Sequence, residues 1–274
     1  MTTLSFEFFP TKTEEGTRKL LAVRDQLAAT NPEFFSVTYG AGGSTQDRTL
    51  SIVESIQQQG IDAAPHLTCV GASKSELRDL LQTYKNMGIK RIVALRGDLP
   101  SGDMSAGELR YASELIEFIR TETGDWFDLE VAAYPEKHPQ AENLENDIQH
   151  FANKVKAGAN SAITQYFFNA DSYFHFVEKA QAKGVDIPIV PGIMPITNYS
   201  KLARFSDACG AEIPRWMRQQ LISYGDDIDS IKAFGTEVIS RMCERLLDGG
   251  APSLHFYTLN QAEACMDVIG NLKG

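Results

Sequence analysis

The chain has 274 residues, of which 43% are hydrophobic and 23% are charged, and its formal net charge at pH 7 is −10. This composition is typical of an ordinary soluble globular protein, and the acidic charge argues against nucleic acid or an anionic membrane as the main partner. The four cysteines are far apart and include no C-x-x-C pair, which favours reduced thiols over a disulfide framework or a zinc site. Because there is neither a secretory signal nor an apolar run long enough to cross a bilayer, we expect a cytoplasmic protein.

The first expected strand, SFEFF at residues 5–9, carries a carboxylate among aromatic residues. Strand alternation places Glu7 on the same face as Ser5, and Phe6 and Phe8 on the opposite face. If the apolar face packs against helices, Glu7 points into the interior of a barrel. A buried carboxylate is either paired, for example with Arg96, or it is a general acid whose pKa is raised by aromatic surroundings. Both interpretations stay open at this point.

Further along the chain, β-rich runs alternate with amphipathic segments such as 13–30 and 73–88, in which apolar residues recur at helical spacing. Several helical segments end on glycine, as at Gly88 and Gly184, where the chain must turn back. Strands are expected at residues 5–9, 34–39, 64–69, 91–97, 129–134, 162–167, 187–193 and 254–259.

Eight strands alternating with helices in a chain of this length indicate a (β/α)8 barrel of the α/β class. No linker divides the chain, so residues 1–274 are interpreted as one domain. The competing fold is an open doubly wound sheet, which usually carries a glycine-rich phosphate fingerprint. The nearest match is YGAGGST at residues 39–45, where Thr45 stands in place of the third glycine. That segment is equally consistent with a tight turn followed by a helix cap.

Polar side chains gather where the expected strands end, which is where barrel enzymes place their chemistry. The set comprises Glu7, Thr38, His66, Arg96, Asp98, Tyr134, His138, Gln165, Tyr257 and Asn260. The opposite ends of the strands carry residues such as Lys90 and Arg91, interpreted as ordinary loop residues. This asymmetry predicts an active mouth at the carboxyl ends of the strands.

The expected strands lack the metal ligands and nucleophiles that several classes of barrel enzyme require. His66 and His138 stand alone rather than as an H-x-H pair, so no metal site is predicted. No lysine lies within a strand to form a Schiff base, and Cys69 is interpreted as a core thiol. An aromatic, hydrogen-bonding mouth suits a large planar organic cofactor better than a metal or a covalent intermediate.

Eight motifs occur in order between residues 5 and 260: SFEFFP, SVTYGAGGST, PHLTC, LRGD-P, AAYPE-HP, AGAN-AITQ-FF, PGIMP and HFYTLN. Together they resemble the bacterial methylenetetrahydrofolate reductases, flavoproteins built on a (β/α)8 barrel. The resemblance implies that NADH or NADPH reduces a bound FAD by ping-pong hydride transfer, and that methylenetetrahydrofolate then receives the hydride. The methyltetrahydrofolate formed would supply methyl groups for methionine synthesis.

The resemblance also implies roles for individual residues. Glu7 matches the family's general acid, and Asp98 matches an aspartate near both flavin and folate. The substrate-binding residues that it implies are Thr38, Asp98, Gln165 and Phe205, and Lys201, which departs from the family pattern, is added to them as a candidate. The FAD-binding residues that it implies are Tyr39, Ala41, His66, Arg96, Gly97, Asp98, Ala112, Tyr134, His138, Ala141, Asp147 and Lys154.

Some positions depart from the family pattern. Gln261 follows HFYTLN where relatives often have an arginine that meets the folate tail, and Lys201 could restore a cation there. Asn153 and His150 replace a frequent arginine and asparagine near the expected FAD site. The chain is expected to be a catalytic barrel without a regulatory domain, to bind small molecules only, and to be able to self-associate through apolar outer-helix positions. A flavin barrel of the related proline-oxidising type and a non-catalytic binding barrel are the alternatives.

Overall fold

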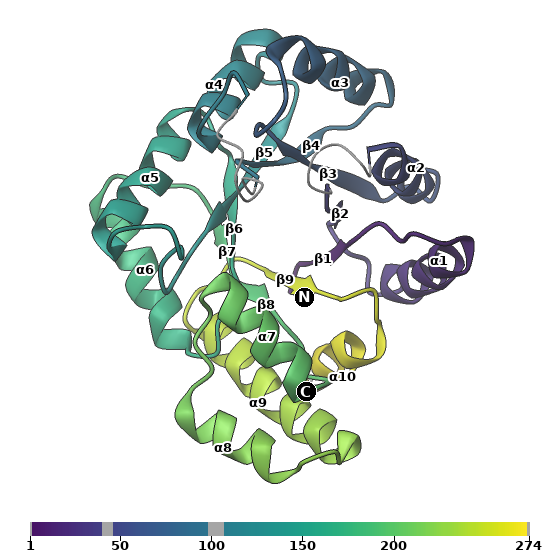
Figure 1. Cartoon of the computed structure of the whole chain (residues 1–274), viewed down its shortest axis with the longest axis vertical. Helices are drawn as coiled ribbons and strands as arrows, with labels where there is room; N and C mark the ends of the chain where they lie inside the picture. The colour runs from purple at the N-terminus through teal and green to yellow at the C-terminus, as the bar shows by residue number, and fades with distance from the viewer. Residues whose placement is uncertain (1, 40–45, 98–106, 273–274) are drawn as a thin grey trace.

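The computed structural model describes residues 2–39, 46–97 and 107–272. Parallel strands form a nearly closed barrel with helices on its outside, which confirms the expected (β/α)8 architecture (Figure 1). Neighbouring strands follow the order β7-β6-β5-β4-β3-β2-β1-β9-β8. The strands are β1 (Leu4–Phe8), β2 (Phe34–Val37), β3 (Asp62–Thr68), β4 (Arg91–Leu95), β5 (Asp128–Ala133), β6 (Ser161–Thr164), β7 (Ile189–Val190), β8 (Gly192–Ile193) and β9 (Leu254–Tyr257).

Helices follow the strands, and the segment between β8 and β9 contains three of them. The helices are α1 (Glu14–Ala28), α2 (Gln46–Gln57), α3 (Lys74–Asn86), α4 (Ala112–Thr123), α5 (Leu144–Lys156), α6 (Ala170–Ala182), α7 (Tyr199–Cys209), α8 (Arg215–Ser223), α9 (Ile228–Asp248) and α10 (Glu263–Asn271). Gly88 and Gly184, with φ of 76° and 82°, follow the ends of α3 and α6 as the sequence predicts. Within the described residues, no helix is both long enough and apolar enough to cross a membrane.

The seventh strand differs from its expected form. The sequence predicts one strand over 187–193, but the structure has two short strands on either side of Pro191. Proline has no amide hydrogen to donate to a neighbouring strand, so it interrupts the ladder. Because β7 pairs with β6 and β8 pairs with β9, this divided strand connects the two ends of the sheet and closes the barrel.

Apolar residues form two separate cores, as strand alternation requires. Phe6 and Phe8 belong to the larger one, between the strands and the helices. The smaller core fills the barrel interior and consists of Phe34, Ala64, Val93 and Ile163. Cys69 lies in the larger core, and burial raises the pKa of its thiol to about 11, in agreement with the predicted structural role.

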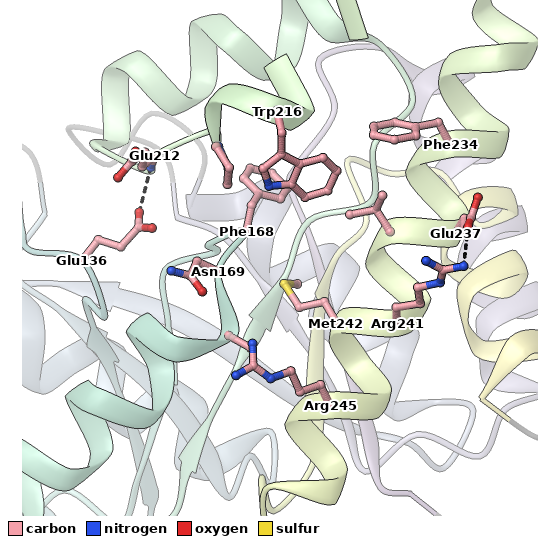
Figure 2. A pocket seen from close by; sticks show the side chains of 13 residues that line it. Glu136, Phe168, Asn169, Glu212, Trp216, Phe234, Glu237, Arg241, Met242 and Arg245 are labelled. Atoms are coloured by element: carbon pink, nitrogen blue, oxygen red, sulfur yellow. Dashed lines mark hydrogen bonds and ion pairs between the residues drawn. The ribbon is translucent and has the colours of Figure 1, made fainter. Parts of the chain in front are cut away.

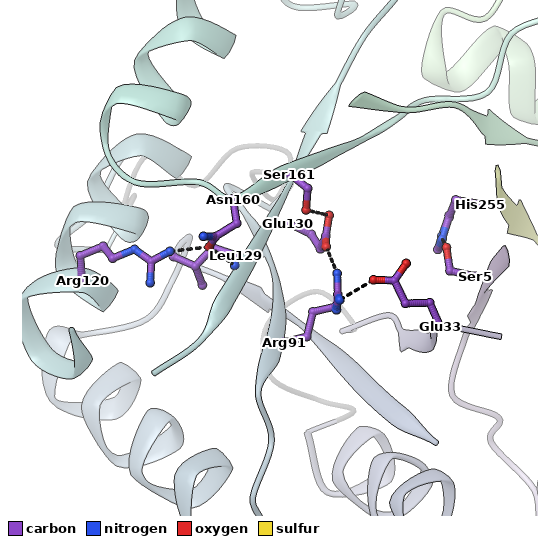
Figure 3. A network of polar contacts seen from close by, with 9 residues as sticks. All are labelled: Ser5, Glu33, Arg91, Arg120, Leu129, Glu130, Asn160, Ser161 and His255. Carbon is purple, nitrogen blue, oxygen red and sulfur yellow. Dashed lines mark hydrogen bonds and ion pairs between the residues drawn. The ribbon is translucent and has the colours of Figure 1, made fainter. Parts of the chain in front are cut away.

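The amino-terminal end of the barrel interior is closed by a polar network (Figure 3). Arg91 bonds the buried carboxylate of Glu130 and lies 2.6 Å from Glu33, and Ser161 donates to Glu130 at 2.5 Å. The Arg91 guanidinium also lies over the ring of Phe34, 4.5 Å from its centroid. The interpretation of Arg91 as an ordinary loop residue was therefore wrong, because its side chain enters the barrel and neutralises a buried charge.

Candidate active site

Glu7 projects into the barrel interior near the carboxyl ends of the strands, as predicted. In the register of the sheet it lies between Ser36 of β2 and Tyr257 of β9. Its side chain is 20% exposed, so it is mostly removed from water yet still accessible from the mouth. The hydroxyl of Thr258 donates to the Glu7 carbonyl at 2.6 Å and ties β1 to the end of β9. The carboxylate therefore sits on a backbone fixed from both sides.

Two imidazoles face this carboxylate, and Arg96 does not. Nε2 of His66 lies 3.3 Å from Oε2 of Glu7, and Nε2 of His255 lies 3.9 Å from the same oxygen. Both Nε2 atoms are buried, and neither completes a hydrogen bond of good geometry with the described part of the chain. On its other side, the His255 ring shares a hydrogen bond of 2.8 Å between Nδ1 and the hydroxyl of Ser5. We call Glu7, His66 and His255 the carboxylate–imidazole cluster.

The pKa of Glu7 is shifted in the direction opposite to the one expected from sequence. Burial by itself raises the pKa of this carboxyl, but the imidazoles of His255 and His66 outweigh burial and lower the pKa to about 2. The expectation of a raised pKa in an aromatic pocket was therefore wrong. The physical reason is that two imidazoles, one on β3 and one on β9, face the carboxylate across the barrel interior. Glu7 is ionised at neutral pH.

His255 is a member of the cluster that the sequence reasoning did not select. It belongs to the motif HFYTLN, and alternation along β9 places it on the interior face together with Tyr257. It is fully buried, and its register partner is Ser5. The alternation rule that selected Glu7 could therefore have selected His255 as well, had it been applied to the last strand.

Two of the predicted FAD-binding residues, Arg96 and Gly97, directly follow β4. Nη2 of Arg96 donates to Oε1 of Gln140 at 2.5 Å, and its Nε donates to the carbonyl of Gly97 at 3.2 Å. Gly97 has a φ of 88°, and a Cβ there would lie 3.0 Å from Cβ of Thr68. This backbone therefore comes close to β3 in a conformation that favours glycine. Ala112 is the first residue of α4.

The segment after β5 supplies the next group of predicted FAD-binding residues. The rings of Tyr134 and His138 meet edge to face, with centroids 4.5 Å apart. The amide of His138 donates to Oδ2 of Asp147 at 2.7 Å, and the amide of Ala141 donates to the His138 carbonyl at 2.9 Å. This loop is thus folded onto the first turn of α5, which brings Asp147 to the rim.

The surroundings of Lys154 test whether the site fits an anionic cofactor. Its ammonium donates to the carbonyl of Ala132, and burial, opposed by the charge of Asp147, lowers its pKa to about 8. No carboxylate within the described part of the chain forms an ion pair with Lys154 within 4.0 Å. A buried ammonium in this position would be stabilised by a phosphate, so the residues present fit the diphosphate of FAD.

The remaining predicted residues are only partly placed. Ala41 and Asp98 lie outside the described residues. Thr38 follows β2, where its amide donates to the Phe8 carbonyl at 2.9 Å, and Tyr39, the next residue, has its pKa raised by burial. Gln165 follows β6, and its side-chain oxygen accepts from the amide of Tyr166 at 3.0 Å.

Lys201 and Phe205 lie on the helix that follows the divided strand. They are four residues apart on α7, and therefore on the same face of that helix. Lys201 is exposed, and its amide is capped by the side chain of Asn198 at 2.9 Å. Phe205 is 39% exposed, less than Phe9 or Trp216, so its exposure alone does not indicate a ligand.

A cavity of about 610 Å³ lies elsewhere, between α6, α8 and α9 (Figure 2). Its apolar wall includes Phe168, Trp216 and Phe234, and Glu136 and Glu212 lie at one end. The amide of Glu212 donates to Glu136 at 2.7 Å. Among the described residues, none of those predicted for the site lines this cavity, so it is separate from the carboxylate–imidazole cluster.

Taken together, the fold and the interior carboxylate define a (β/α)8-barrel protein with a titratable site at the carboxyl ends of its strands. Comparison with protein families makes the class specific, since the model of the family described as methylenetetrahydrofolate reductase matches residues 1–273. The chain belongs to the methylenetetrahydrofolate reductase family.

Individual relatives agree with this assignment. The chain is 44% identical over 270 residues to the 5,10-methylenetetrahydrofolate reductase of Escherichia coli strain K12, with 98% of this chain and 90% of the relative covered. It is 39% identical to a protein of Oryza sativa named as a probable methylenetetrahydrofolate reductase (NADH), of which it covers 48% while 99% of this chain is matched.

Solved structures support the fold. An uncharacterised protein from Clostridium thermocellum, described as binding two copies of 5-methyl-5,6,7,8-tetrahydrofolic acid, superposes with a TM-score of 0.65 at 16% identity. The alignment covers 98% of this chain and 93% of that one. Dihydropteroate synthase from Thermus thermophilus superposes with a TM-score of 0.51 at 10% identity, covering 100% of this chain and 94% of that one. At such identities the likeness shows the barrel fold alone.

Proposed function

We propose that this chain reduces 5,10-methylenetetrahydrofolate to 5-methyltetrahydrofolate, with NADH or NADPH as the donor and FAD as the bound cofactor, in a ping-pong sequence. The proposal is carried by one observation: the barrel interior holds an acid–base cluster at the carboxyl ends of its strands in a chain of this family. The product would serve as a methyl donor for methionine synthesis. Residues 1–274 would act as a single catalytic domain.

The reaction requires a proton as well as a hydride. The methylene group of the substrate bridges two nitrogens, and it accepts a hydride readily only after one carbon–nitrogen bond opens to give an iminium cation. Opening that bond needs a proton on the departing nitrogen, so an acid must lie beside the ring. Glu7 is the residue that we assign to this role.

The lowered pKa of Glu7 is compatible with this role. When a substrate excludes water from the interior, the ionised carboxylate loses more solvation than the neutral acid. Binding of the substrate therefore favours the protonated form of Glu7, from which the substrate nitrogen can take the proton.

The cofactor would lie across the ends of β4 and β5. Arg96, Gly97 and Ala112 would contact it on one side, and Tyr134 and His138 would pack against it. Lys154 would meet its diphosphate, and Asp147 would accept hydrogen bonds from its sugar. When bound, FAD would supply hydride transfer between the nicotinamide and the one-carbon unit. Tyr39, Ala41, His66, Asp98 and Ala141 complete the set that the resemblance implies.

The two substrates would occupy the same mouth in turn. Thr38 and Gln165 would contact the nicotinamide, and Gln165 and Asp98 would contact the folate. Lys201 and Phe205, which share a face of α7, would meet the part of the folate that extends beyond the barrel.

The test is spectroscopic and chemical. The purified protein, reconstituted with FAD if necessary, should show flavin absorbance that NADH or NADPH bleaches without oxygen. Adding methylenetetrahydrofolate should restore the absorbance and yield one methyltetrahydrofolate per flavin. A protein that cannot take up FAD would favour a binding barrel. A flavin that is bleached but never reoxidised by methylenetetrahydrofolate would exclude the reductase assignment.

A further inference from the structure

The chain leaves the last strand through a tight turn at the mouth of the barrel, where β9 and β1 lie side by side (Figure 1). The amide of Gln261 donates to the carbonyl of Thr258 at 2.9 Å and closes this turn. We call residues 258–261 the rim turn. It contains Asn260, one of the polar residues that the sequence places at the mouth and to which the proposed function assigns no role.

The rim turn has a backbone conformation that residues other than glycine rarely adopt. Leu259 and Asn260, its two central residues, have φ of 48° and 56°. Asparagine tolerates this left-handed region, but a bulky side chain such as leucine is an outlier there. Packing of Leu259 against the larger core helps to hold the conformation. Such strain persists only where surrounding contacts fix it, and it is concentrated at functional sites.

The side chain of Asn260 extends the sheet beyond the end of β9. The register pairs of β1 and β9 end at Glu7 and Tyr257. Two residues after Glu7, the amide of Phe9 donates to Oδ1 of Asn260 at 3.1 Å, and Nδ2 of Asn260 donates to the Phe9 carbonyl at 2.9 Å. One carboxamide therefore bonds both backbone groups of Phe9, as a residue of a neighbouring strand would.

Thr258 joins the rim turn to Glu7 itself. Its hydroxyl donates to the Glu7 carbonyl at 2.6 Å and accepts from the amide of Asn260 at 3.0 Å. Thr258 is 4% exposed, so water does not compete for these bonds. Thr258 and Asn260 together fix the chain from Glu7 to Phe9 on the side that faces β9.

We propose that Thr258 and Asn260 are positioning residues for Glu7, and that the rim turn holds the Glu7 carboxyl where the folate nitrogen takes its proton. This inference rests on the proposed function. The acid is needed when methylenetetrahydrofolate is reduced, and not when the nicotinamide reduces the flavin. Loosening the rim turn should therefore slow one half-reaction and spare the other.

Stopped-flow absorbance on the FAD-loaded protein measures the two half-reactions separately. Asn260→Gly removes the carboxamide but allows the same positive φ, so the rim turn can form without its bonds to Phe9. We expect reoxidation by saturating methylenetetrahydrofolate to slow by about tenfold to 100-fold, because a small displacement of a reacting group has effects of this size. Reduction of the flavin by NADH or NADPH should stay within about twofold of wild type, because it does not use the acid.

Asn31→Gly is the matched control. Asn31 also has a positive φ, of 55°, and it is exposed between α1 and β2, at the amino-terminal end of the barrel. The control therefore makes the same substitution in the same backbone conformation at the end opposite the mouth. Both half-reactions should keep their wild-type rates.

A second pair of variants tests the other attachment. Thr258→Val removes the hydroxyl with little change of shape, and it should repeat the selective slowing of reoxidation. Thr258→Ser keeps the hydroxyl and should restore most of the rate. If Asn260→Gly does not fold or does not take up FAD, this pair decides the question.

A double variant distinguishes positioning of Glu7 from a general loosening of the mouth. Glu7→Gln leaves no acid to be positioned, so adding Asn260→Gly should change its rate of reoxidation by less than about twofold. A rim turn with a merely structural role would instead slow Glu7→Gln by the same factor as it slows wild type.

Three results would overturn the inference. The first is reoxidation at the wild-type rate in Asn260→Gly or in Thr258→Val. The second is equal slowing of both half-reactions in these variants. The third is an additive loss in the double variant. The proposed function fails separately, if wild type itself is reduced by NADH or NADPH but is not reoxidised by methylenetetrahydrofolate.

Discussion

Glu7 is ionised at neutral pH because two imidazoles compensate for its burial. The same carboxyl in a purely aromatic pocket would hold its proton to a higher pH. The neighbours of Glu7 thus decide whether its carboxyl is ionised. Two consequences can be measured at the scale of this residue.

The first consequence is kinetic. Glu7→Gln keeps the shape of the side chain but cannot donate a proton as a carboxylic acid does. We expect reduction of the flavin by NADH or NADPH to stay within a few-fold of wild type, and reoxidation by methylenetetrahydrofolate to slow by about 100-fold or more. Stopped-flow absorbance separates the two half-reactions. Ser36→Ala, which changes an interior neighbour of Glu7, serves as the control and should leave both rates unchanged. Equal damage to both half-reactions in Glu7→Gln would argue against the assigned role.

The second consequence is thermodynamic. The pKa of Glu7 is lowered on folding from 4.5 to about 2, so its ionised form stabilises the folded protein above pH 4.5 and this contribution is lost as the pH falls toward 2. The free energy of unfolding of wild type minus that of Glu7→Gln should therefore shrink by about 2 kcal/mol as the pH falls from 6 to 3. Urea unfolding between pH 6 and pH 3 measures the difference. A difference that grows on acidification would contradict the lowered pKa.

Arg91 joins three strands at their amino-terminal ends. Its guanidinium, on β4, forms ion pairs with Glu130 on β5 and with Glu33 just before β2. Glu130 is 1% exposed, so its charge depends on this guanidinium. Such a network does little for net stability compared with an apolar core, but losing one partner is costly. It also separates the apolar interior from solvent at the end opposite the candidate site.

This linkage predicts a non-additive pair of substitutions. Arg91→Met should cost about 3–5 kcal/mol of unfolding free energy, because it leaves Glu130 buried and unneutralised. Adding Glu130→Gln should recover at least about 1 kcal/mol, since Ser161 can still donate to the amide oxygen. Arg241→Met removes an exposed pair with Glu237 and should cost less than about 0.5 kcal/mol. Chemical denaturation of wild type, Arg91→Met, Glu130→Gln and the double variant tests the cycle, and additive losses would show that the pair is not coupled.

At the scale of the whole molecule, closure of the barrel depends on a close approach at the divided strand. Gly192 donates from its amide to the Thr164 hydroxyl at 2.9 Å, and the Tyr257 hydroxyl donates to the Thr164 carbonyl at 2.8 Å. A Cβ on Gly192 would lie 2.1 Å from that carbonyl oxygen. The position of a Cβ is fixed by the backbone, so no rotamer change can relieve its clash with the Thr164 carbonyl oxygen. Only glycine, which carries a hydrogen in place of Cβ, permits barrel closure at this position.

We therefore expect Gly192→Ala to lower the free energy of unfolding by more than about 3 kcal/mol. Gly270→Ala is the matched control, because a Cβ at that position in α10 would meet no heavy atom within 4 Å. This control should be neutral or stabilising by up to about 1 kcal/mol. Urea unfolding of both variants provides the comparison, and a Gly192→Ala protein as stable as wild type would refute the steric account.

Much of the architecture was predictable because it depends on local periodicity. Alternation along SFEFF places Glu7 inside, and the repeat of strand and helix predicts both the barrel and the end at which polar residues gather. The divided strand was missed because Pro191 interrupts pairing without breaking the apolar pattern. Arg91 was misinterpreted because a charged residue at the start of a strand looks like a loop residue until the partner on the next strand is known.

The sequence alone determined the barrel, its polar mouth and the family resemblance, since these follow from residue order and short-range geometry. Only the tertiary structure decided the protonation of the site. His255 and Glu7 are separated by almost the whole chain, and they meet because β9 pairs with β1. A pKa responds to charges within a few ångströms through space, whatever their separation along the chain. The ionisation of Glu7 therefore depends on barrel closure, which no local sequence pattern predicts.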